Sequence, residues 1–516
     1  MEKQGRILWV DDEIELLKPY FIFLEEKGYE LVTATNGQDA LELFRAEKFD
    51  IVFLDENMPG ANGLKVLSEL KKIDSNTPVV MITKSEEEDI MDMAIGNKIT
   101  DYLTKPVNPN QILLTLKKTI HRRAIMTEQV TSGYRNDFGQ IGMQLSDKLT
   151  HEEWVELYKK LVHWDLALDE TDTGMHEILQ MQWAEANTVF TKYIKENYAR
   201  WFQQPDTRPL ISPDLFRKRI FPLMDAGERV FMVVLDNFRF DQWRVVQNIL
   251  SEYFTFDSEE LYYSILPTTT QYARNAIFAG LMPLQIAQMF PDFWVGAEED
   301  EGKNQMEDAL IQTQLDRFRR KCSFSYYKIN QSQGGEQLIE QLPQLIDNPL
   351  NVCVLNFIDM LSHARTESKM IRELASSESA YRSLAVSWFR HSSTLRLFKE
   401  LAQKQFKVVV TTDHGAIRVQ KAIKVRGNKN TSVNMRFKLG KQLSYNPKEV
   451  FAILQPEKFG LPSPDVSSTY IFATGSNFFA YPNNYNYYVT YYRDTFQHGG
   501  ISLEEMMVPF IVMSPR

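Results

Sequence analysis

The sequence is poor in cysteine, with only Cys322 and Cys353 among its 516 residues. Small secreted domains that depend on disulfides carry more cysteines in much shorter chains. Two cysteines therefore exclude a disulfide-based scaffold and fit a protein that works in a reducing compartment.

The sequence also lacks long apolar segments. No uninterrupted apolar run approaches the roughly 20 residues that cross a bilayer as a helix. The first residues, Met-Glu-Lys-Gln-Gly-Arg, lead directly into a strand-like segment without the apolar core of a signal peptide. We therefore expect a cytoplasmic protein without a membrane span.

An excess of positive charge is missing as well, because the net charge is −10. This balance disfavours bulk binding to nucleic acid, although local basic patches can still contact phosphates. The hydrophobic fraction of 43% and the charged fraction of 24% are typical of soluble globular proteins. A chain of this length is expected to divide into two or three domains.

The C-terminal half contains an acid and an imidazole directly after a strand-like run. Residues 408–412, Val-Val-Val-Thr-Thr, precede Asp413, His414 and Gly415. The β-branched run predicts a buried strand. In an open α/β sheet, ligands bind at the carboxyl ends of the strands. Aspartate and neutral histidine are suitable ligands for a divalent metal such as zinc.

Four more candidate ligands follow strand-like or helical segments of the same half: Asp236, Asp359, His363 and His498. Asp359 and His363 are four residues apart, a spacing that places both side chains on one face of a helix. The whole set comprises three acids and three histidines. A two-metal site needs about this many ligands, with its ions roughly 3.5–4 Å apart.

A candidate nucleophile lies in residues 266–270, Leu-Pro-Thr-Thr-Thr, which are followed by Gly280 and Pro283. This pattern resembles the alkaline phosphatase superfamily, in particular its PglZ-type members and the nucleotide pyrophosphatases/phosphodiesterases. In the phosphodiesterase branch the nucleophile lies three residues after the first proline. The resemblance therefore implies that Thr270 is the nucleophile. Two neighbouring threonines remain as alternatives: Thr268 and Thr269.

The same resemblance implies two zinc ions. It assigns four ligands to one ion: Asp236, Thr270, Asp413 and His414. It assigns three ligands to the other: Asp359, His363 and His498. Coordination to a metal lowers the pKa of a threonine hydroxyl and makes its oxygen a nucleophile. The second ion would stabilise charge on the phosphoryl oxygens.

The N-terminal part alternates strand-like and helical segments. A strand-like run at residues 6–10 precedes Asp11 and Asp12, and a second run at 50–54 precedes Asp55. This alternation predicts a doubly wound parallel sheet with acids at the strand ends. Acids clustered there bind Mg²⁺, and a lysine nearby can pair with a phosphoryl group.

Residues 1–123 resemble the receiver domain of two-component response regulators. The resemblance implies that Asp55 accepts the phosphoryl group and that Asp11 and Asp12 hold Mg²⁺ together with it. One departure is Lys84, because a small residue usually follows the switch hydroxyl in this family. The switch hydroxyl, the switch aromatic and the phosphate-pairing lysine would be Thr83, Tyr102 and Lys105.

The middle of the chain contains few strand signals and is predicted to be helical. One helix is expected to begin at His151, with Asp147 or Thr150 as its N-cap. The predicted fold class is α/β, with a flavodoxin-like doubly wound receiver domain, a helical linker bundle and a larger alkaline-phosphatase-like α/β effector domain. These three domains are expected at residues 1–123, 124–207 and 208–516.

A basic stretch lies between His414 and His498, with no acid between Asp413 and Glu449. We hypothesise that it binds substrate phosphates, the alternative being an ordinary solvated surface. The tyrosine-rich segment 481–492 could stack bases or could pack against a sheet. The basic residues expected to contact substrate are Lys424, Arg426 and Lys429.

The order of receiver, helical linker and PglZ-type domain resembles the PorX-type response regulators, which are linked to type IX secretion. This resemblance implies a partner histidine kinase of the PorY type and an output through secretion genes or machinery. We expect phosphorylation to favour a homodimer. The expected activity is zinc-dependent hydrolysis of nucleotide or oligonucleotide phosphodiesters. The alternative is a non-enzymatic regulator whose metal-bound effector domain binds a sigma factor or a secretion component.

Overall fold

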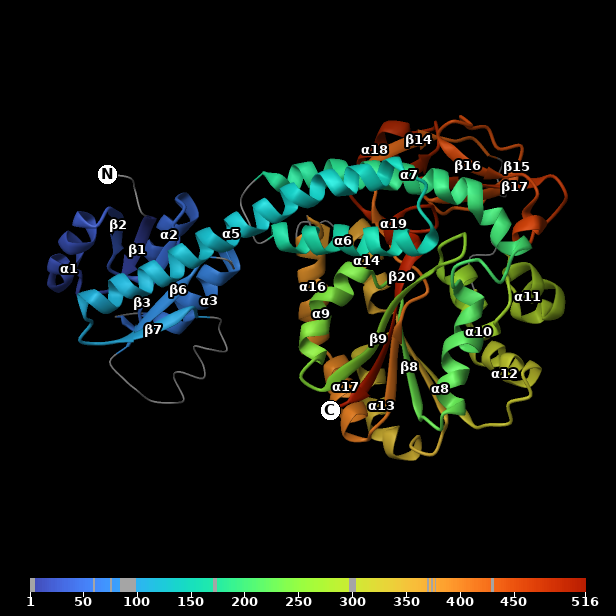
Figure 1. The fold of residues 1–516 in the computed structure, drawn as a ribbon, viewed down its shortest axis with the longest axis horizontal. Helices are drawn as coiled ribbons and strands as arrows, with labels where there is room; N and C mark the ends of the chain where they lie inside the picture. Colours follow the sequence, from blue (N-terminus) through green and yellow to red (C-terminus); the bar gives the residue numbers. More distant parts are fainter. Residues whose placement is uncertain are drawn as a thin grey trace. The chain divides into compact units, whose positions relative to one another are not determined.

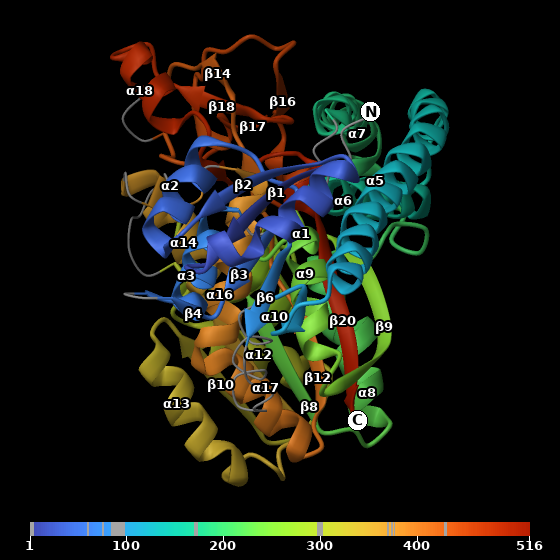
Figure 2. The same cartoon turned by 90° about the vertical axis from the view of Figure 1, so that its left-hand side faces the viewer.

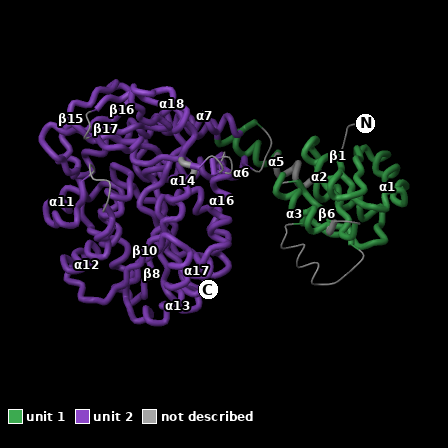
Figure 3. Tube along the Cα trace, turned by 180° about the vertical axis from the view of Figure 1, so that it is seen from behind, with its two compact units in different colours: residues 1–137, 170–175 green, residues 138–169, 176–516 purple. Residues whose placement is uncertain are grey.

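The computed structural model describes residues 5–58, 61–74, 77–83, 99–169, 174–296, 303–368, 371–372, 375, 377–427 and 431–516. The chain divides into two compact units (Figure 3): residues 1–137 with 170–175, and residues 138–169 with 176–516. Within the described ranges, no helix is both long and apolar enough to span a bilayer.

The first unit contains a five-stranded sheet in the order β2-β1-β3-β6-β7, and each neighbouring pair is parallel. Its strands are β1 (Gly5–Val10), β2 (Tyr29–Ala34), β3 (Ile51–Asp55), β6 (Val79–Thr83) and β7 (Asp101–Thr104). The other elements are α1 (Ile14–Glu26), α2 (Gly37–Ala46), α3 (Gly63–Ile73), the short pair β4 (Asn57–Met58) and β5 (Ala61–Asn62), and the start of α5 (Pro109–Ser146). The predicted doubly wound receiver fold is confirmed.

Side-chain alternation along β1 explains why helices cover both faces of this sheet. Leu8 and Val10 belong to an apolar core with residues of α2 and α3. Ile7 and Trp9 belong to another core with residues of α1 and α5. Because successive side chains of a strand point to opposite faces, a strand that is apolar throughout must be buried on both sides.

The helices predicted for the middle of the chain are the last part of α5, α6 (His151–Asp169) and α7 (Met175–Gln203). Thr150 caps α6: its hydroxyl accepts a hydrogen bond from Glu153 N, and the Glu153 carboxylate accepts one from Thr150 N at 2.7 Å. The Trp154 ring packs edge-on against Phe190 of α7, with the centroids 5.2 Å apart. Aromatic side chains therefore hold these helices together.

The effector part contains a six-stranded sheet in the order β10-β11-β8-β12-β20-β9. Its first four strands are parallel, and β20 pairs in the antiparallel sense with both β12 and β9. Every residue of β8 and β11 is buried, because helices cover both faces. The strands are β8 (Val230–Leu235), β9 (Phe254–Tyr263), β10 (Phe324–Ile329), β11 (Leu350–Leu355), β12 (Lys407–Thr411) and β20 (Met507–Pro515).

Figure 1 shows α8, α10 and α12 along one face of this sheet, and α9, α16 and α17 along the other. The helices of the effector part are α8 (Phe221–Asp225), α9 (Phe240–Leu250), α10 (Asn275–Ala279), α11 (Pro283–Met289), α12 (Glu307–Arg317), α13 (Ser332–Gln341), α14 (Phe357–Glu367), α16 (Glu378–His391), α17 (Ser393–Gln403) and α19 (Leu503–Met506). A π-helical turn, η3 (Thr270–Arg274), directly precedes α10.

A group of small sheets is inserted between β12 and β20, and Figures 1 and 2 show it beyond one end of the six-stranded sheet. Two of these sheets are strand pairs, β13–β19 and β14–β18, and the third has three strands in the order β15-β17-β16. The members are β13 (Ile417–Arg418), β14 (Lys421–Lys424), β15 (Phe437–Lys441), β16 (Val450–Ile453), β17 (Ser468–Ala473), β18 (Asn477–Ala480), α18 (Tyr485–Tyr492) and β19 (Phe496–Gln497).

Candidate functional site

Three of the predicted zinc ligands meet at the carboxyl ends of the parallel neighbours β8 and β12. Asp236 directly follows β8, and Asp413 and His414 follow β12 after one residue. His414 Nε2 lies 3.7 Å from Asp236 Oδ1 and 3.9 Å from Asp413 Oδ2. One ligand atom from each of the three side chains lies within 4.8 Å of the other two. We call these three residues the first cluster.

Thr270, the predicted nucleophile, lies against the first cluster. It is the first residue of η3, and its Oγ1 lies 3.3 Å from Asp236 Oδ1 and 3.2 Å from His414 Nε2. Its two alternatives are placed differently. The Thr268 hydroxyl accepts a hydrogen bond from Gly499 N at 3.0 Å and donates one to a backbone carbonyl. Thr269 Oγ1 is buried and forms no hydrogen bond with any residue that the structure describes. The catalytic role of Thr270 stays a prediction.

The remaining predicted ligands form a second cluster, made of Asp359, His363 and His498. Asp359 and His363 lie one turn apart on α14, with Asp359 Oδ2 3.4 Å from His363 Nε2. His498 follows β19, and its Nε2 lies 3.5 Å from Asp359 Oδ1. The His363 side chain is 61% exposed, so this cluster is open to solvent on one side.

The two clusters are adjacent. The His414 and His498 rings are stacked at 4.3 Å between centroids. Asn237 contacts both clusters: its side chain donates to Asp359 Oδ1 at 3.1 Å, and its backbone N–H donates to Asp413 Oδ1 at 3.4 Å. Its φ of 63° lies in the left-handed region, which asparagine tolerates better than most residues. The zinc ligands predicted from the sequence therefore gather in one place.

His414, which is buried, and His498, which is largely buried, turn the same nitrogen toward the carboxylates. His414 Nδ1 lies 3.1 Å from Gly415 O, and His498 Nδ1 lies 3.3 Å from Thr268 O. A carbonyl next to Nδ1 requires the proton on that nitrogen, which leaves Nε2 as a free ligand atom. Burial lowers the pKa of both rings, that of His498 to about 4. Both rings are therefore neutral at pH 7, as metal ligands must be.

The carboxylates of the first cluster fit a cation. Burial, together with the charges of Asp413 and Asp359, raises the pKa of Asp236 to about 7, and burial also raises the pKa of Asp413. None of the described residues forms a hydrogen bond with Asp413 Oδ2, and the nearby Arg274 guanidinium is 3.6 Å away. Carboxylate oxygens beside neutral imidazole nitrogens are the donor set that divalent zinc prefers.

Arg274 belongs to the site but was not among the residues predicted from the sequence. It lies four residues after Thr270, and its Nη1 lies 2.7 Å from Asp236 Oδ2 and 3.6 Å from Asp413 Oδ2. On its other side, Nε lies 2.5 Å from Glu307 Oε1. The signal available in the sequence was its spacing of four residues from Thr270, which places both side chains on one side of a helical turn. The sequence could not show which carboxylates Arg274 contacts.

Helix α7 holds two of the loops that carry site residues. The Tyr198 hydroxyl accepts a hydrogen bond from Leu266 N at 2.8 Å, next to the threonine run. Asn187 Oδ1 accepts one from Leu503 N at 2.8 Å, and its amide donates to Glu504 at 3.1 Å. Gly415 is required in the same region, because a Cβ there would collide with the Glu504 carbonyl.

The predicted receiver residues gather at the carboxyl ends of β1 and β3. Asp11, Asp12 and Asp55 each place one carboxylate oxygen within 4.8 Å of the others. Lys105 Nζ lies 2.9 Å from Asp11 Oδ2 and 3.1 Å from Asp55 Oδ1. Burial and the neighbouring Asp11 charge raise the pKa of Asp55. Three carboxylates fit the preference of Mg²⁺ for oxygen ligands.

The predicted switch residues lie nearby in the sheet. The Thr83 hydroxyl, at the end of β6, donates a hydrogen bond to the Glu56 carboxylate. The Tyr102 side chain is exposed on β7. Lys84 lies outside the described residues.

Two of the predicted substrate contacts, Lys424 and Arg426, lie in the segment inserted between β12 and β20. Lys424 is exposed on β14, and its ammonium lies 4.8 Å from the centre of the Tyr485 ring. Arg426 is exposed and forms an isolated backbone bridge with Ser444. Lys429 lies outside the described residues. Among the residues that the structure does describe, no hydrogen bond or ion pair joins Lys424 or Arg426 to either ligand cluster.

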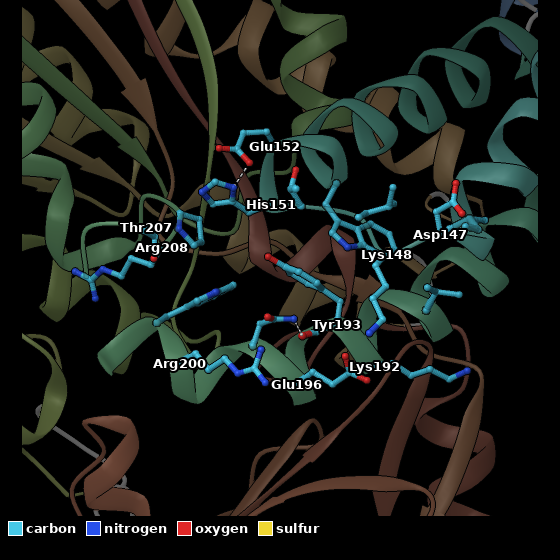
Figure 4. Close-up of a pocket in the computed structure, with 18 of the residues that line it drawn as sticks. Asp147, Lys148, His151, Glu152, Lys192, Tyr193, Glu196, Arg200, Thr207 and Arg208 are labelled. Carbon is cyan, nitrogen blue, oxygen red and sulfur yellow. Dashed lines mark hydrogen bonds and ion pairs between the residues drawn. The ribbon is translucent and has the colours of Figure 1, made fainter. Parts of the chain in front are cut away.

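A cavity of about 740 Å³ lies apart from both clusters, between the start of α6 and the second half of α7. Figure 4 shows His151 and Glu152 at one side of it and Lys192, Glu196 and Arg200 at another. No predicted site residue lines this cavity, so it forms no part of the candidate metal centre.

Three family profiles match the chain, in the predicted order. The receiver domain of response regulators matches residues 7–117, and the PorX response regulator linker domain matches residues 124–202. The family described as the BREX system PglZ alkaline phosphatase-like domain matches residues 215–513, more than half of the chain. The resemblance to PorX-type response regulators with a PglZ domain is therefore confirmed.

Curated relatives are similar to the receiver part. The alginate biosynthesis transcriptional regulatory protein AlgB of Pseudomonas aeruginosa is 36% identical over 124 residues, which are 24% of this chain and 28% of that protein. The CpxR homolog of Haemophilus influenzae is 34% identical over 130 residues, which are 25% of this chain and 56% of that protein. The chain thus spans about a quarter to a half of these relatives' lengths.

Solved structures are also similar to this part. A CheY-like receiver domain protein from Methanospirillum hungatei is 26% identical and covers 23% of this chain and 94% of its own, with a TM-score of 0.22. The chemotaxis protein CheY4 of Vibrio cholerae is 29% identical and covers 22% of this chain and 98% of its own, also with a TM-score of 0.22.

Proposed function

The chain belongs to the PglZ family of alkaline-phosphatase-like proteins, in the PorX-type order of receiver, linker and effector, and on this premise we propose that it is a response regulator with a zinc-dependent phosphodiesterase output. Phosphorylation of Asp55 controls the effector, which hydrolyses nucleotide or oligonucleotide phosphodiesters. We assign the receiver, the linker and the effector to residues 1–123, 124–207 and 208–516.

The observation that carries this proposal is the position of the Thr270 hydroxyl, 3.3 Å from an Asp236 oxygen and 3.2 Å from His414 Nε2. A hydroxyl surrounded by a carboxylate and an imidazole that are both candidate metal ligands is placed for activation as a nucleophile. A second ligand cluster alongside supports a site that binds a phosphoryl group between two cations.

One zinc ion would be held by four residues: Asp236, Thr270, Asp413 and His414. The other would be held by three: Asp359, His363 and His498. Bound there, the ions would supply the positive charge that lowers the pKa of the Thr270 hydroxyl and balances the phosphoryl oxygens. The Gly415 and Thr268 carbonyls fix the tautomers of the two buried histidines.

Hydrolysis then proceeds in two displacements at phosphorus. The Thr270 oxygen forms a bond to phosphorus while the bond from phosphorus to one ester oxygen breaks, and that oxygen leaves with a proton. Water next attacks the phosphothreonine, a bond from water oxygen to phosphorus forms, and the Thr270 oxygen leaves and regains its proton. Arg274 holds the carboxylates of Asp236 and Asp413 in place throughout.

In the receiver, Asp11, Asp12 and Asp55 would hold Mg²⁺, and Lys105 would pair with the phosphoryl group on Asp55. The phosphoryl donor is a sensor histidine kinase of the PorY type. Phosphorylation favours a cytoplasmic homodimer, and the output is linked to the regulation of type IX secretion. Gel filtration with and without a phosphoryl mimic tests the dimer; identical elution would contradict it.

The activity is tested with purified, zinc-loaded protein on bis(p-nitrophenyl) phosphate and on the p-nitrophenyl monoester. We expect diester turnover that chelation abolishes and that Thr270→Ala lowers by at least about 10³-fold, while Thr270→Ser keeps part of it. Thr269→Ala is the matched control, because its buried hydroxyl has no partner.

Two outcomes would overturn parts of this proposal. Activity lost in Thr269→Ala and kept in Thr270→Ala would move the nucleophile to Thr269. Absence of turnover from protein with both zinc ions bound would instead support the non-enzymatic regulator, in which the metal-bound effector binds a protein partner.

A further inference from the structure

Helix α18 is unusually rich in tyrosine for a surface element. Its sequence is Tyr-Asn-Tyr-Tyr-Val-Thr-Tyr-Tyr, and none of its residues is buried. Three of its tyrosines pack against the apolar cluster that Ile417 helps to form: Tyr485, Tyr488 and Tyr492. These rings attach the helix to the inserted sheets. The two other tyrosines are not part of that cluster.

Those two, Tyr487 and Tyr491, form the outward face of α18. They are four residues apart, so that both lie on one side of the helix. Their rings are nearly parallel, with centroids 5.8 Å apart and an angle of 17° between the ring planes. Tyr487 is 63% exposed, which leaves much of its ring open to a further flat group.

Cations accompany the aromatic rings of this helix. The Arg372 guanidinium lies 5.4 Å from the centre of the Tyr491 ring. At the other end of the helix, the Lys424 ammonium lies 4.8 Å from the Tyr485 ring. The acid that follows the helix, Asp494, is neutralised by an ion pair with Arg418 at 3.1 Å. Open aromatic faces flanked by cations match a ligand with planar rings and negative charge.

The outward face is connected through Arg372 and Thr366 to α14, the helix that carries Asp359 and His363. Arg372 Nη2 also donates to the Thr366 carbonyl at 2.6 Å, and Thr366 follows His363 by nearly one helical turn, about 5 Å along α14. From the other side, Gln497, the residue before His498, donates to the Thr366 hydroxyl at 3.4 Å. These contacts place the outward face of α18 beside α14, which carries the exposed ligand His363.

We propose that Tyr487 and Tyr491 form a base-stacking subsite that binds single-stranded nucleic acid next to the zinc centre. This proposal rests on the phosphodiesterase function above and narrows its substrate to oligonucleotides with unpaired bases. A base stacks on the open ring of Tyr487, Tyr491 supports that ring, and Arg372 and Lys424 face the phosphates. A duplex is excluded as the preferred ligand, because its bases do not offer free faces.

The test measures binding separately from turnover. Fluorescence anisotropy of 5′-fluorescein-labelled hexathymidylate is measured with the full-length, zinc-loaded Thr270→Ala protein, which does not cleave the probe. Adding either Tyr487→Ala or Tyr491→Ala should weaken binding about tenfold. This loss is near the lower end of the binding contribution of one base–aromatic stack. Tyr487→Phe and Tyr491→Phe keep the rings and should stay within about twofold.

Leu454→Ala is the matched control for loss of an exposed apolar side chain, since Leu454 is 64% exposed, and it should leave binding unchanged. Zinc content and circular dichroism verify folding of each variant. In the nucleophile-intact protein, the alanine variants should raise KM for a short oligonucleotide about tenfold. They should leave kcat/KM for bis(p-nitrophenyl) phosphate within about twofold.

The outcomes separate the two proposals. If the alanine substitutions weaken probe binding but the nucleophile-intact protein shows no turnover, the subsite is supported and the proposed activity is contradicted. Diester turnover with unchanged oligonucleotide binding and KM in both alanine variants overturns the subsite alone. A wild-type protein that does not bind the probe, or phenylalanine variants as weak as the alanine variants, also overturns it.

Discussion

The receiver and the effector each gather three aspartates near the carboxyl ends of parallel strands, but they balance the negative charge differently. In the receiver, the Lys105 ammonium lies within ion-pair distance of both Asp11 and Asp55, and Asp12 is exposed to water. The ammonium and the solvent therefore offset much of the negative charge of these carboxylates.

In the effector, Asp236 and Asp413 are buried and share one guanidinium, that of Arg274. None of the described residues forms a hydrogen bond with one oxygen of Asp413, and burial raises the pKa of both carboxyls. Because these two buried carboxyls share one guanidinium, their protonation is coupled to any cation that binds beside them. The comparison teaches that the receiver balances its acids with an ammonium and solvent, whereas the effector buries two of its acids against one guanidinium.

The largest expected effect comes from removing one carboxylate charge in each region. Asp413→Asn should lower zinc content and reduce diester turnover at least about 100-fold, because a ligand is lost. Its phosphorylation by acetyl phosphate should stay at the wild-type level. Asp55→Asn should abolish phosphorylation and leave zinc content unchanged. Metal analysis and phosphate-affinity gels measure both; zinc retained at full stoichiometry in Asp413→Asn would contradict the comparison.

Arg274→Ala tests the fixed charge of the effector. Removing one partner of a buried ionic group leaves the carboxylates unpaired and should lower the free energy of unfolding by about 3 kcal/mol in metal-free protein. Added zinc should restore part of that loss, which urea unfolding with and without zinc would reveal. Arg320→Ala, which breaks a surface pair with Asp225, is the control and should leave the unfolding midpoint unchanged.

Glu504→Gln tests the loop that α7 holds beside Gly415. Burial raises the pKa of Glu504 to about 7. Because the pKa of Glu504 is higher in the folded than in the unfolded protein, the protonated carboxyl stabilises the folded state below the pKa of the unfolded state. This stabilisation is lost as the pH rises through 7. Between pH 5 and pH 8, the free energy of unfolding of the glutamine variant should therefore rise by about 2 kcal/mol relative to that of wild type.

Thermal or urea unfolding at several pH values measures this change. Glu457→Gln, at an exposed position, is the control and should follow the wild-type profile. A difference between Glu504→Gln and wild type that stays constant from pH 5 to pH 8 would show that Glu504 is not held protonated by burial.

The smallest effect is expected from the basic stretch. Lys424→Ala and Arg426→Ala should each raise KM for an oligonucleotide two- to threefold at low salt, and the difference should vanish at high salt because both side chains are exposed. Turnover of bis(p-nitrophenyl) phosphate should not change. Lys458→Ala, another exposed cation, is the control; an equal effect there would assign the change to net charge alone.

Much of the fold and of the candidate site was accessible from the sequence because its signals are local. A β-branched run followed by Asp413 and His414 predicts a strand and its ligand-bearing end from adjacent residues. The spacing of Asp359 and His363 predicts a shared helix face in the same way. The choice among three adjacent threonines was different, because nothing in a Thr-Thr-Thr run distinguishes their side-chain directions.

By itself, the sequence determined the order of the three domains and the identity of the ligand-type residues, since strand periodicity and short motifs are properties of neighbouring residues. Only the tertiary structure decided which groups complete the site: the Arg274 contact with Asp236, the Thr268 carbonyl that sets the His498 tautomer, and the Asn187 contacts with the loop of Glu504. The partners in these contacts are 38, 230 and 317 residues apart. Packing of the whole sheet and its helices brings them together, and no local pattern encodes that distance.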